Sequence, residues 1–399
     1  MTSVGYLDSG RREWQRLKDS AWDSAMITWV PVLALALIWW IFATGLPQRL
    51  PIAVVDADNS ALSRQLTRML QASPGLAVQQ VVTDASSIAQ ALRSGQVFAV
   101  VRIPTTLTQT IKQGQATQVT LLYNAQLGTH AGLIQRDVRT VVATLSAGIE
   151  MTARNKQGEP LQLAQQSFEP LRAQGISLFN VSLNYEQFLA AALIPALLHI
   201  FAMTAGAWSV GRELRERTLR LWLDLPTMES NAPSHSAALQ ALLGKLAWPL
   251  LSLGTIGSAA MMGLTHGRGW QPAGSLPWVL LALWVFLALS LAMGAVASAV
   301  SRSLRMGLSV TGFITAPAFA FSGLGYPLQS MPELAQLWAR ALPYTQYLRL
   351  QTEQLLMGVP LEIGLQPLLN MLVSLLILIT ICTHLLRASA TQPATWGRR

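Results

Sequence analysis

The stretch PWVLLALWVFLALSLAMGAVASAV, residues 277–300, contains no Asp, Glu, Lys or Arg. A helix needs about 20 apolar residues to cross the hydrocarbon core of a bilayer. Because lipid offers no partners for backbone polar groups, a segment of this kind is stable there only as a helix. The stretch is therefore predicted to be a transmembrane helix, and the same pattern predicts four more spans at residues 25–44, 187–209, 241–264 and 364–386.

One more span, the fifth in chain order, is predicted at residues 306–326, where the sequence is less apolar and rich in Gly, Ser and Thr. Small residues of this kind are typical of a helix packed against other helices in a membrane. Residues 328–348 are too polar to cross, and their apolar face indicates a re-entrant or interfacial helix at the outer surface. The predicted fold class is an α-helical polytopic membrane protein with about six transmembrane helices.

The composition agrees with this class, because 51% of residues are hydrophobic and only 12% are charged. Soluble domains are about a quarter charged. The net charge of +9 comes mainly from Lys and Arg at the ends of apolar segments, where they act as topology signals. We therefore expect contact with the lipid bilayer and none with nucleic acid. The single cysteine, Cys382, lies in the last apolar run, so no disulfide is expected.

The distribution of basic residues predicts the orientation. With the N-terminus in the cytoplasm, most Lys and Arg of the short connections fall on the inner side, whereas the short outer loops carry only Arg268, Arg340 and Arg349. Both termini are therefore predicted to be cytoplasmic. Residues 1–24 are predicted to form an amphipathic helix on the inner surface, and residues 387–399 a cytoplasmic tail.

Residues 45–186 are predicted to form an extracytoplasmic α/β domain inserted after the first span. Strands alternating with helices indicate such a domain. Strands are expected at residues 51–58, 77–82, 97–104 and 119–124. Helices are expected at residues 60–71 and 86–94, with a long connector helix over residues 129–170 that leads back to the membrane.

Several functions are disfavoured by what the sequence lacks. There is no G-x-x-x-x-G-K-[ST] motif, so any ATP hydrolysis belongs to another chain. No nucleophile–base pair or metal-ligand cluster is evident, and we expect neither an enzyme nor a cofactor bound by this chain. No carboxylate or basic residue lies in the middle of a span, which argues against an ion-coupled carrier. His199 is the titratable residue well inside a span, where it either bonds to a neighbouring helix or touches substrate.

The segment VGRELRERTLRLWLDLP, residues 210–226, follows the second span and alternates in charge before an amphipathic run that ends at Pro226. One interpretation is a solvated loop with positive-inside arginines. The other is a helix that docks onto a partner protein and transmits force to the attached span.

Four segments, in order along the chain, resemble the membrane subunits of type-2 ABC exporters that carry a large periplasmic domain after the first span. They are VVDADNSALSRQL at 54–66, LRSGQVFAVVRIP at 92–104, GRELRERTLRLWLDLP at 211–226 and FSGLGYPLQSMPELAQLWARALPYTQYL at 321–348. The chain departs from the family pattern at one position, because Arg217 precedes Thr218 where family members commonly have Gly. That Gly helps the chain turn, so the local geometry there is in question.

The resemblance implies the permease subunit of an ATP-driven exporter in a bacterial cytoplasmic membrane. The implied partners are a separate ABC-type ATPase that holds ATP and Mg, and a second permease copy in a homodimer or heterodimer. It also allows for a periplasmic membrane-fusion adaptor. By position in the motif, the residues implied to couple to the ATPase are Arg212, Glu213, Arg215, Glu216 and Thr218.

A substrate pathway is expected between the two subunits, lined by the second and fifth spans. Its candidate residues are Pro195, His199, Thr204, Thr311, Thr315, Phe319 and Ser322. A pathway without fixed charge suits a hydrophobic or amphiphilic substrate such as a drug-like compound. Two alternatives remain at this point: an ion-driven secondary transporter, and a membrane sensor or scaffold whose exterior domain binds a ligand.

Overall fold

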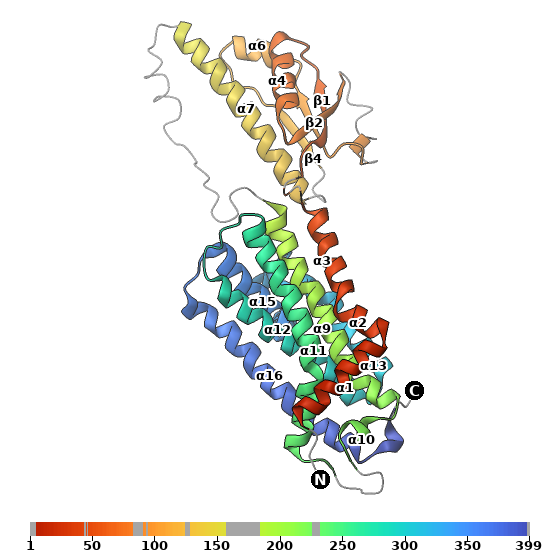
Figure 1. Ribbon diagram of the computed structural model, residues 1–399. Helices are drawn as coiled ribbons and strands as arrows, with labels where there is room; N and C mark the ends of the chain where they lie inside the picture. Colours follow the sequence, from red (N-terminus) through yellow and green to blue (C-terminus); the bar gives the residue numbers. More distant parts are fainter. Residues whose placement is uncertain are drawn as a thin grey trace. The chain divides into compact units, whose positions relative to one another are not determined.

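The computed structural model describes residues 5–43, 45, 47–82, 91–92, 95–123, 128–156, 184–225 and 232–396. The chain divides into two compact units, one formed by Met1–Gly45 with Ser177–Arg399 and one formed by Leu46–Ile176. We call them the membrane unit and the sheet unit (Figure 1). This division falls close to the predicted boundaries at residues 45 and 186. The side of a membrane on which the sheet unit lies stays a prediction.

Five helical stretches in the described part of the chain are long and apolar enough to cross a membrane: Ala21–Ile41, Glu186–Arg215, His235–Gly267, Leu276–Ser301 and Leu361–Ala390. They coincide with five predicted spans. Their helices are α2 (Ala21–Ile27), α3 (Trp29–Ile41), α9 (Ala191–Arg215), α11 (His235–Met262), α12 (Leu276–Ser301) and α16 (Leu361–Ala390). The chain is thus a mostly helical polytopic membrane protein with a small sheet-containing domain.

The first span is broken at Thr28, between α2 and α3, where the backbone has φ −119° and ψ −93°. A break inside a membrane frees backbone groups that need new partners. The Ser252 hydroxyl of α11 supplies one, because it donates a hydrogen bond to the Ile27 carbonyl. The uninterrupted helix predicted at residues 25–44 is therefore two helices joined by a bend that a neighbouring helix supports.

The fifth predicted span in chain order, at residues 306–326, is shorter than expected. Its helix, α13 (Leu304–Ala318), has 15 residues and is thus about 22 Å long, less than the roughly 30 Å hydrocarbon core. It ends just after Pro317, and a 3₁₀ turn, Ala320–Ser322, leads to Gly323 at φ +87°. The prediction of one helix over residues 306–326 is wrong, because the proline and the left-handed glycine stop it.

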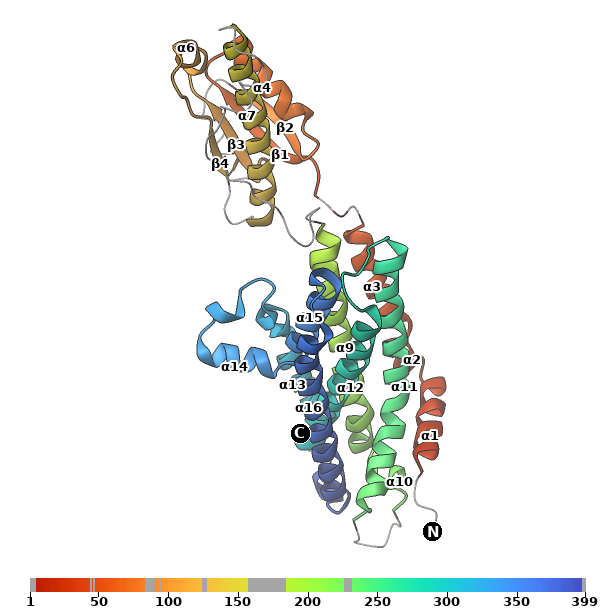
Figure 2. The same cartoon turned by 90° about the vertical axis from the view of Figure 1, so that its left-hand side faces the viewer.

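The outer helix predicted at residues 328–348 is also two helices, α14 (Glu333–Ala341) and α15 (Pro343–Thr352). Pro343 disfavours helical geometry at the residue before it, and Leu342 accordingly has φ −74° and ψ 126°. Figure 2 shows α1 (Tyr6–Asp19) alongside α11, and α14 on the other side of the membrane unit.

The backbones of α9 and α12 approach closely in the core of the membrane unit. A Cβ added to Gly294 would lie 1.9 Å from the Met203 carbonyl oxygen, and one added to Gly206 would lie 2.0 Å from the Leu291 carbonyl oxygen. Small residues allow such contact between helices in lipid. The two glycines therefore fix where α9 and α12 cross.

This crossing gives a first prediction. Gly294→Ala is expected to lower the free energy of unfolding by about 1–3 kcal/mol, because the new methyl group must push the helices apart. Gly312→Ala in α13 is the matched control, since a Cβ there meets nothing within 4 Å. It is expected to be neutral or slightly stabilising. Thermal unfolding in detergent measures both, and equal midpoints for the two variants would contradict the close crossing.

The sheet unit contains a four-stranded sheet in the order β2-β1-β3-β4. β1 is parallel to β2 and β3, and β4 is antiparallel to β3. The strands are β1 (Leu50–Asp56), β2 (Leu76–Val82), β3 (Ala99–Ile103) and β4 (Thr120–Tyr123). The helices are α4 (Ala61–Ala72), α6 (Leu107–Lys112) and α7 (Gly128–Lys156).

These elements confirm the four predicted strands and the helix at residues 60–71, whereas α6 was not predicted. Most of the helix predicted at residues 86–94 lies outside the described residues. The connector helix predicted at residues 129–170 corresponds to α7 as far as residue 156, and the rest of it also lies outside them. One face of the sheet buries Ile52, Val54 and Val101 against Leu66 and Leu70 of α4.

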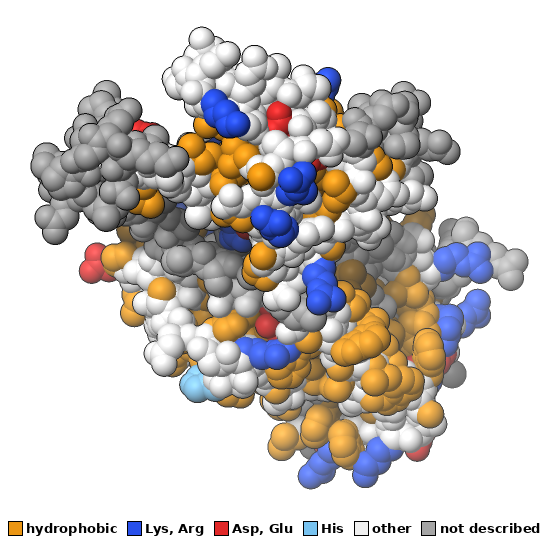
Figure 3. Space-filling view, turned by 90° about the horizontal axis from the view of Figure 1, so that it is seen from above, with side chains coloured by type: hydrophobic (Ala, Val, Ile, Leu, Met, Phe, Trp, Pro, Cys, Tyr) orange, Lys and Arg blue, Asp and Glu red, His pale blue; other side chains and the backbone are white. Residues whose placement is uncertain are grey.

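Large hydrophobic side chains remain exposed on the membrane unit. Trp40 on α3 is 74% exposed and Leu376 on α16 is 66% exposed. Figure 3, a view of the molecule from above, shows groups of hydrophobic side chains at the surface with Lys and Arg between them. A soluble protein seldom leaves such patches open, so these faces are suited to lipid or to another membrane helix.

Candidate functional site

The segment at residues 210–226 begins inside the second span. α9 continues without interruption to Arg215, so the first part of the segment is the end of the span itself. After a short turn, α10 (Leu219–Trp222) forms a single helical turn. The amphipathic helix predicted here is therefore much shorter than expected, and Pro226 lies outside the described residues.

The turn between α9 and α10 depends on Arg217, whose φ is +59°. The Thr218 N–H donates to the Glu213 carbonyl at 2.9 Å, the bond that closes a Schellman motif. Such a motif requires a left-handed residue after the helix, which favours Gly. Arg217 adopts the conformation that Gly would adopt, so the departure from the family pattern leaves the chain path intact and adds backbone strain.

Relief of this strain is the second prediction. Arg217→Gly is expected to raise the free energy of unfolding by about 1 kcal/mol, because glycine tolerates positive φ. Arg217→Ala is the control, since it removes the same side chain and keeps the strain. Thermal unfolding of the two purified variants measures the difference, and an Ala variant as stable as the Gly variant would show that the turn is unstrained.

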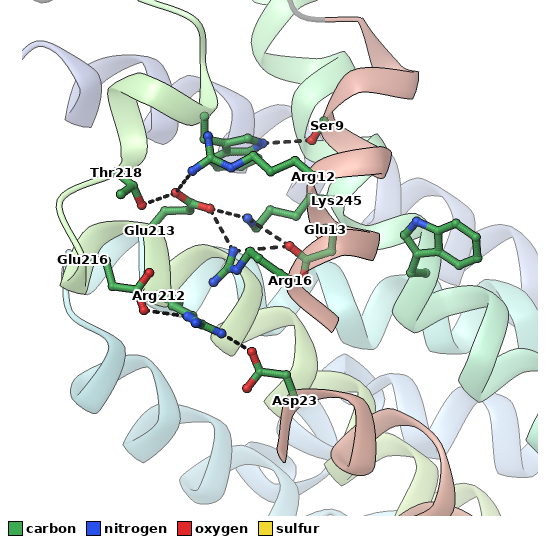
Figure 4. A network of polar contacts seen from close by, with 12 residues as sticks. Ser9, Arg12, Glu13, Arg16, Asp23, Arg212, Glu213, Glu216, Thr218 and Lys245 are labelled. Carbon is green, nitrogen blue, oxygen red and sulfur yellow. Dashed lines mark hydrogen bonds and ion pairs between the residues drawn. The ribbon is translucent and has the colours of Figure 1, made fainter. Parts of the chain in front are cut away.

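Glu213 is the centre of a cluster of charged groups at this end of the membrane unit (Figure 4). Its side chain is 1% exposed. One carboxylate oxygen, Oε1, accepts from Lys245 Nζ at 2.5 Å and from Arg16 Nη1 at 2.8 Å. The other, Oε2, accepts from Arg12 Nη2 at 3.2 Å and from Thr218 Oγ1 at 2.5 Å. One carboxylate thus joins α9 to α1, to α11 and to the turn before α10.

A second acid, Glu13 of α1, completes the cluster. Its Oε2 atom lies 3.1 Å from Lys245 Nζ and 3.3 Å from Arg16 Nη1. Lys245 is itself 1% exposed and lies over the Trp222 ring, 4.8 Å from its centroid. Buried charges are stable only when they are paired and hydrogen-bonded. The three bases and two acids therefore hold α1, α9 and α11 together, with α10 packed against them.

Neutral contacts hold α1 in the same place. The Trp222 indole N–H of α10 donates to Ser9 Oγ at 2.9 Å, and the Ser9 hydroxyl donates to the Ala241 carbonyl at 2.6 Å. Trp14 stacks on Trp248 with centroids 4.5 Å apart. Residues 1–24, predicted to lie as a helix on the membrane surface, thus contain a helix whose buried face packs on α11.

A more exposed set of charges surrounds the cluster. Arg212 pairs with Asp23 of α2, and its Nε donates to Glu216 Oε1 at 2.6 Å. Partial burial raises the pKa of the Glu216 carboxyl, but the hydrogen bond and charge of Arg212 outweigh it and hold that pKa below its ordinary value. The exposed rim is defined here as Arg215, Glu216, Arg217 and Leu221, the last of which is 70% exposed.

The five predicted coupling residues thus fall into two groups. Glu213 and Thr218 bond inward, so neither presents its functional group to a partner protein, whereas Arg215 and Glu216 are exposed. Arg212 is partly exposed and bridges the two groups. Sequence reasoning missed the residues that surround Glu213, namely Arg12, Glu13, Arg16 and Lys245. Two features of the sequence could have indicated them. Arg12 and Arg16 lie four residues apart in an amphipathic helix, and Lys245 lies at the start of an apolar run.

The predicted pathway residues are mostly packed within the chain. His199 is 1% exposed, its Nδ1 lies 2.8 Å from Ser290 Oγ of α12, and its ring lies 5.4 Å from that of Phe286. Pro195 is buried, whereas Thr204 and Phe319 are half-buried. The buried hydroxyls of the fifth span donate to carbonyls of their own segment, in Thr311, Thr315 and Ser322. Whether these residues line a pathway stays a prediction.

Within the described ranges, no three His, Cys, Asp or Glu side chains gather as metal ligands would. A family model described as "ABC-2 family transporter protein" matches residues 22–383. No curated protein matches the chain.

Proposed function

Because the chain belongs to the ABC-2 family of transporter proteins, we propose that it is the membrane-spanning permease subunit of an ATP-driven exporter in a bacterial cytoplasmic membrane. A separate ABC-type ATPase binds ATP and Mg and hydrolyses the nucleotide. The substrate is a hydrophobic or amphiphilic compound that leaves the cytoplasm or the inner leaflet. Both termini, the exposed rim and the ATPase lie on the cytoplasmic side.

The observation that carries the proposal is the cluster around Glu213. An isolated surface helix would move without displacing the span behind it. Here the end of α9 is fixed to α1 and α11 by buried ion pairs, and α10 is fixed to α1 through Trp222 and Ser9. A displacement applied at the exposed rim therefore reaches α9 as a rigid-body motion.

Roles within the segment follow from exposure. The exposed rim supplies the contact with the ATPase, with two arginines for electrostatic complementarity and Leu221 for an apolar pocket. Glu213 and Thr218 position the rim. Two permease copies, identical or related, form the transporter, with the second and fifth spans at the pathway between them. The sheet unit meets substrate or a periplasmic membrane-fusion adaptor.

The experiment that tests the proposal is co-purification of the tagged full-length chain from its native membrane in mild detergent, followed by identification of the bound proteins and an ATPase assay. We expect an ABC-type ATPase to co-purify with the chain and its ATP hydrolysis to respond to amphiphilic compounds. If no ATPase is recovered with a folded chain, the exporter assignment is wrong.

A further inference from the structure

A cavity of about 630 Å³ lies in the membrane unit, between α12 and the helices α14, α15 and α16. Its lining is mixed and contains six apolar residues, among them Leu289, Met371 and Val373, and seven polar ones. None of the residues of the Glu213 cluster contributes to its wall, so the cavity is a separate site.

Two arginines line this cavity, Arg340 from α14 and Arg349 from α15. They are two of the three basic residues in the short connections predicted to be outside. Arg349 Nε donates to Glu353 Oε1 at 2.8 Å, so part of its charge is balanced. Arg340 donates to the neutral Gln336 at 3.2 Å, and none of the ion pairs found among the described residues involves it. The wall of the cavity thus contains two arginines and no acidic residue, so its net charge is positive.

The polar part of the wall reaches deep along α16. Asn370 and Ser374 line the cavity and lie nine and thirteen residues beyond Leu361, where α16 begins. At 1.5 Å per residue, they are about 14 and 20 Å from that end. Polar groups at such depth in a span are costly unless they have polar partners, and Gln366 supplies one to Asn370 by donating to its Oδ1 atom at 3.0 Å. Gln329, Thr345 and Gln346 add further hydrogen-bonding groups to the same wall.

An exposed apolar stripe runs along α16 beside the cavity, and Leu376 and Ile377 extend it past Ser374. Leu369, Val373, Leu376 and Ile377 recur at helical spacing and are 43–66% exposed. Val373 belongs both to the cavity wall and to this stripe. A cationic, hydrogen-bonding recess is therefore continuous with an apolar face, which is the arrangement that an anionic amphiphile requires. A phosphate matches the arginines, and alkyl chains match the stripe.

We propose that this cavity binds the anionic head group of a bilayer phospholipid, whose acyl chains lie along the α16 stripe. The occupant is a lipid of the leaflet at the end of the membrane unit where α16 begins. The proposal does not depend on the direction of transport or on the ATPase, because it requires only that the membrane unit is embedded in a bilayer.

The test is native mass spectrometry of the full-length chain in neutral detergent with added phosphatidylglycerol or phosphatidylcholine of identical acyl chains. We expect phosphatidylglycerol to be retained about tenfold more than phosphatidylcholine, and Arg340→Gln to abolish most of that preference. Arg305→Gln is the matched control, because it removes an equally positive, exposed side chain from α13 outside the cavity. Arg349→Lys keeps the charge and is expected to keep the preference.

Three outcomes would overturn the proposal. The first is equal retention of the two lipids, and the second is an equal loss in the Arg305→Gln control. The third is stronger binding of single-chain dodecyl phosphate than of phosphatidylglycerol, which would assign the cavity to a soluble anionic amphiphile. Unfolding midpoints of the variants separate loss of the site from loss of the fold, and Arg349→Gln, which is also expected to lower the preference, provides a second charge-removing variant if Arg340→Gln is unstable.

Discussion

Glu213→Ala is expected to lower the free energy of unfolding of the membrane unit by about 3–5 kcal/mol, the range measured when one partner of a buried ion pair is removed. The loss has a direct cause. Lys245 is 1% exposed and would keep only Glu13 as a counter-charge, while Arg12 would lose its acidic partner in the cluster. Thermal or chemical unfolding of the detergent-purified chain measures the effect.

Glu216→Ala is the matched control for this experiment. It removes the same type of side chain three residues away, but Glu216 is 38% exposed and pairs with arginines in contact with solvent. Pairs of that kind contribute about 0–1 kcal/mol. A further comparison is the double variant Glu213→Gln with Lys245→Met, which removes both charges and is expected to recover part of the lost stability. Equal effects of Glu213→Ala and Glu216→Ala would show that the cluster does not stabilise the fold.

Leu221→Asp is expected to weaken the binding of the ATPase by at least tenfold while leaving the fold of this chain unchanged. Leu221 is 70% exposed, so a polar replacement costs the isolated chain little. At the centre of a docking interface, the same change places a charge in an apolar pocket and removes an anchor. The dissociation constant of the purified ATPase for the permease, measured in nanodiscs, gives the effect.

The control for the docking prediction is Leu122→Asp on β4, an exposed leucine (49%) in the sheet unit. It introduces the same side chain at a position that the proposal keeps away from the ATPase. If both variants bind the ATPase as tightly as the wild type does, the exposed rim is not the docking surface.

The spans and the sheet were predictable because each rests on local pattern. A charge-free run such as residues 277–300 can be only a helix in a membrane, and strands such as β1 and β3 are short, buried and bounded by turn residues. The errors occur where one residue overrides the pattern. Pro317 and Gly323 end the fifth helix early, and Pro343 divides the outer helix.

The candidate site was only half predictable. The charged residues at 212–218 are neighbours in the sequence, so their proximity could be predicted without the fold. The residues that pair with Glu213 could not be predicted in this way. Arg12 and Arg16 are about 200 positions away and meet Glu213 only because α1 packs on α11. The resemblance to the exporter family assigned Glu213, by its position in the motif, to the contact with the ATPase. Burial by α1 gives it an internal role.

The most direct test of the coupling mechanism is the stimulation of ATP hydrolysis by an amphiphilic substrate in the reconstituted permease–ATPase complex, compared between wild type and Glu213→Gln. The variant keeps the shape of the side chain and the exposed rim but loses the charge that joins α9 to α1 and α11. We expect that, below its unfolding midpoint, the variant still binds the ATPase and loses most of the stimulation. Full stimulation in a folded Glu213→Gln complex would contradict it.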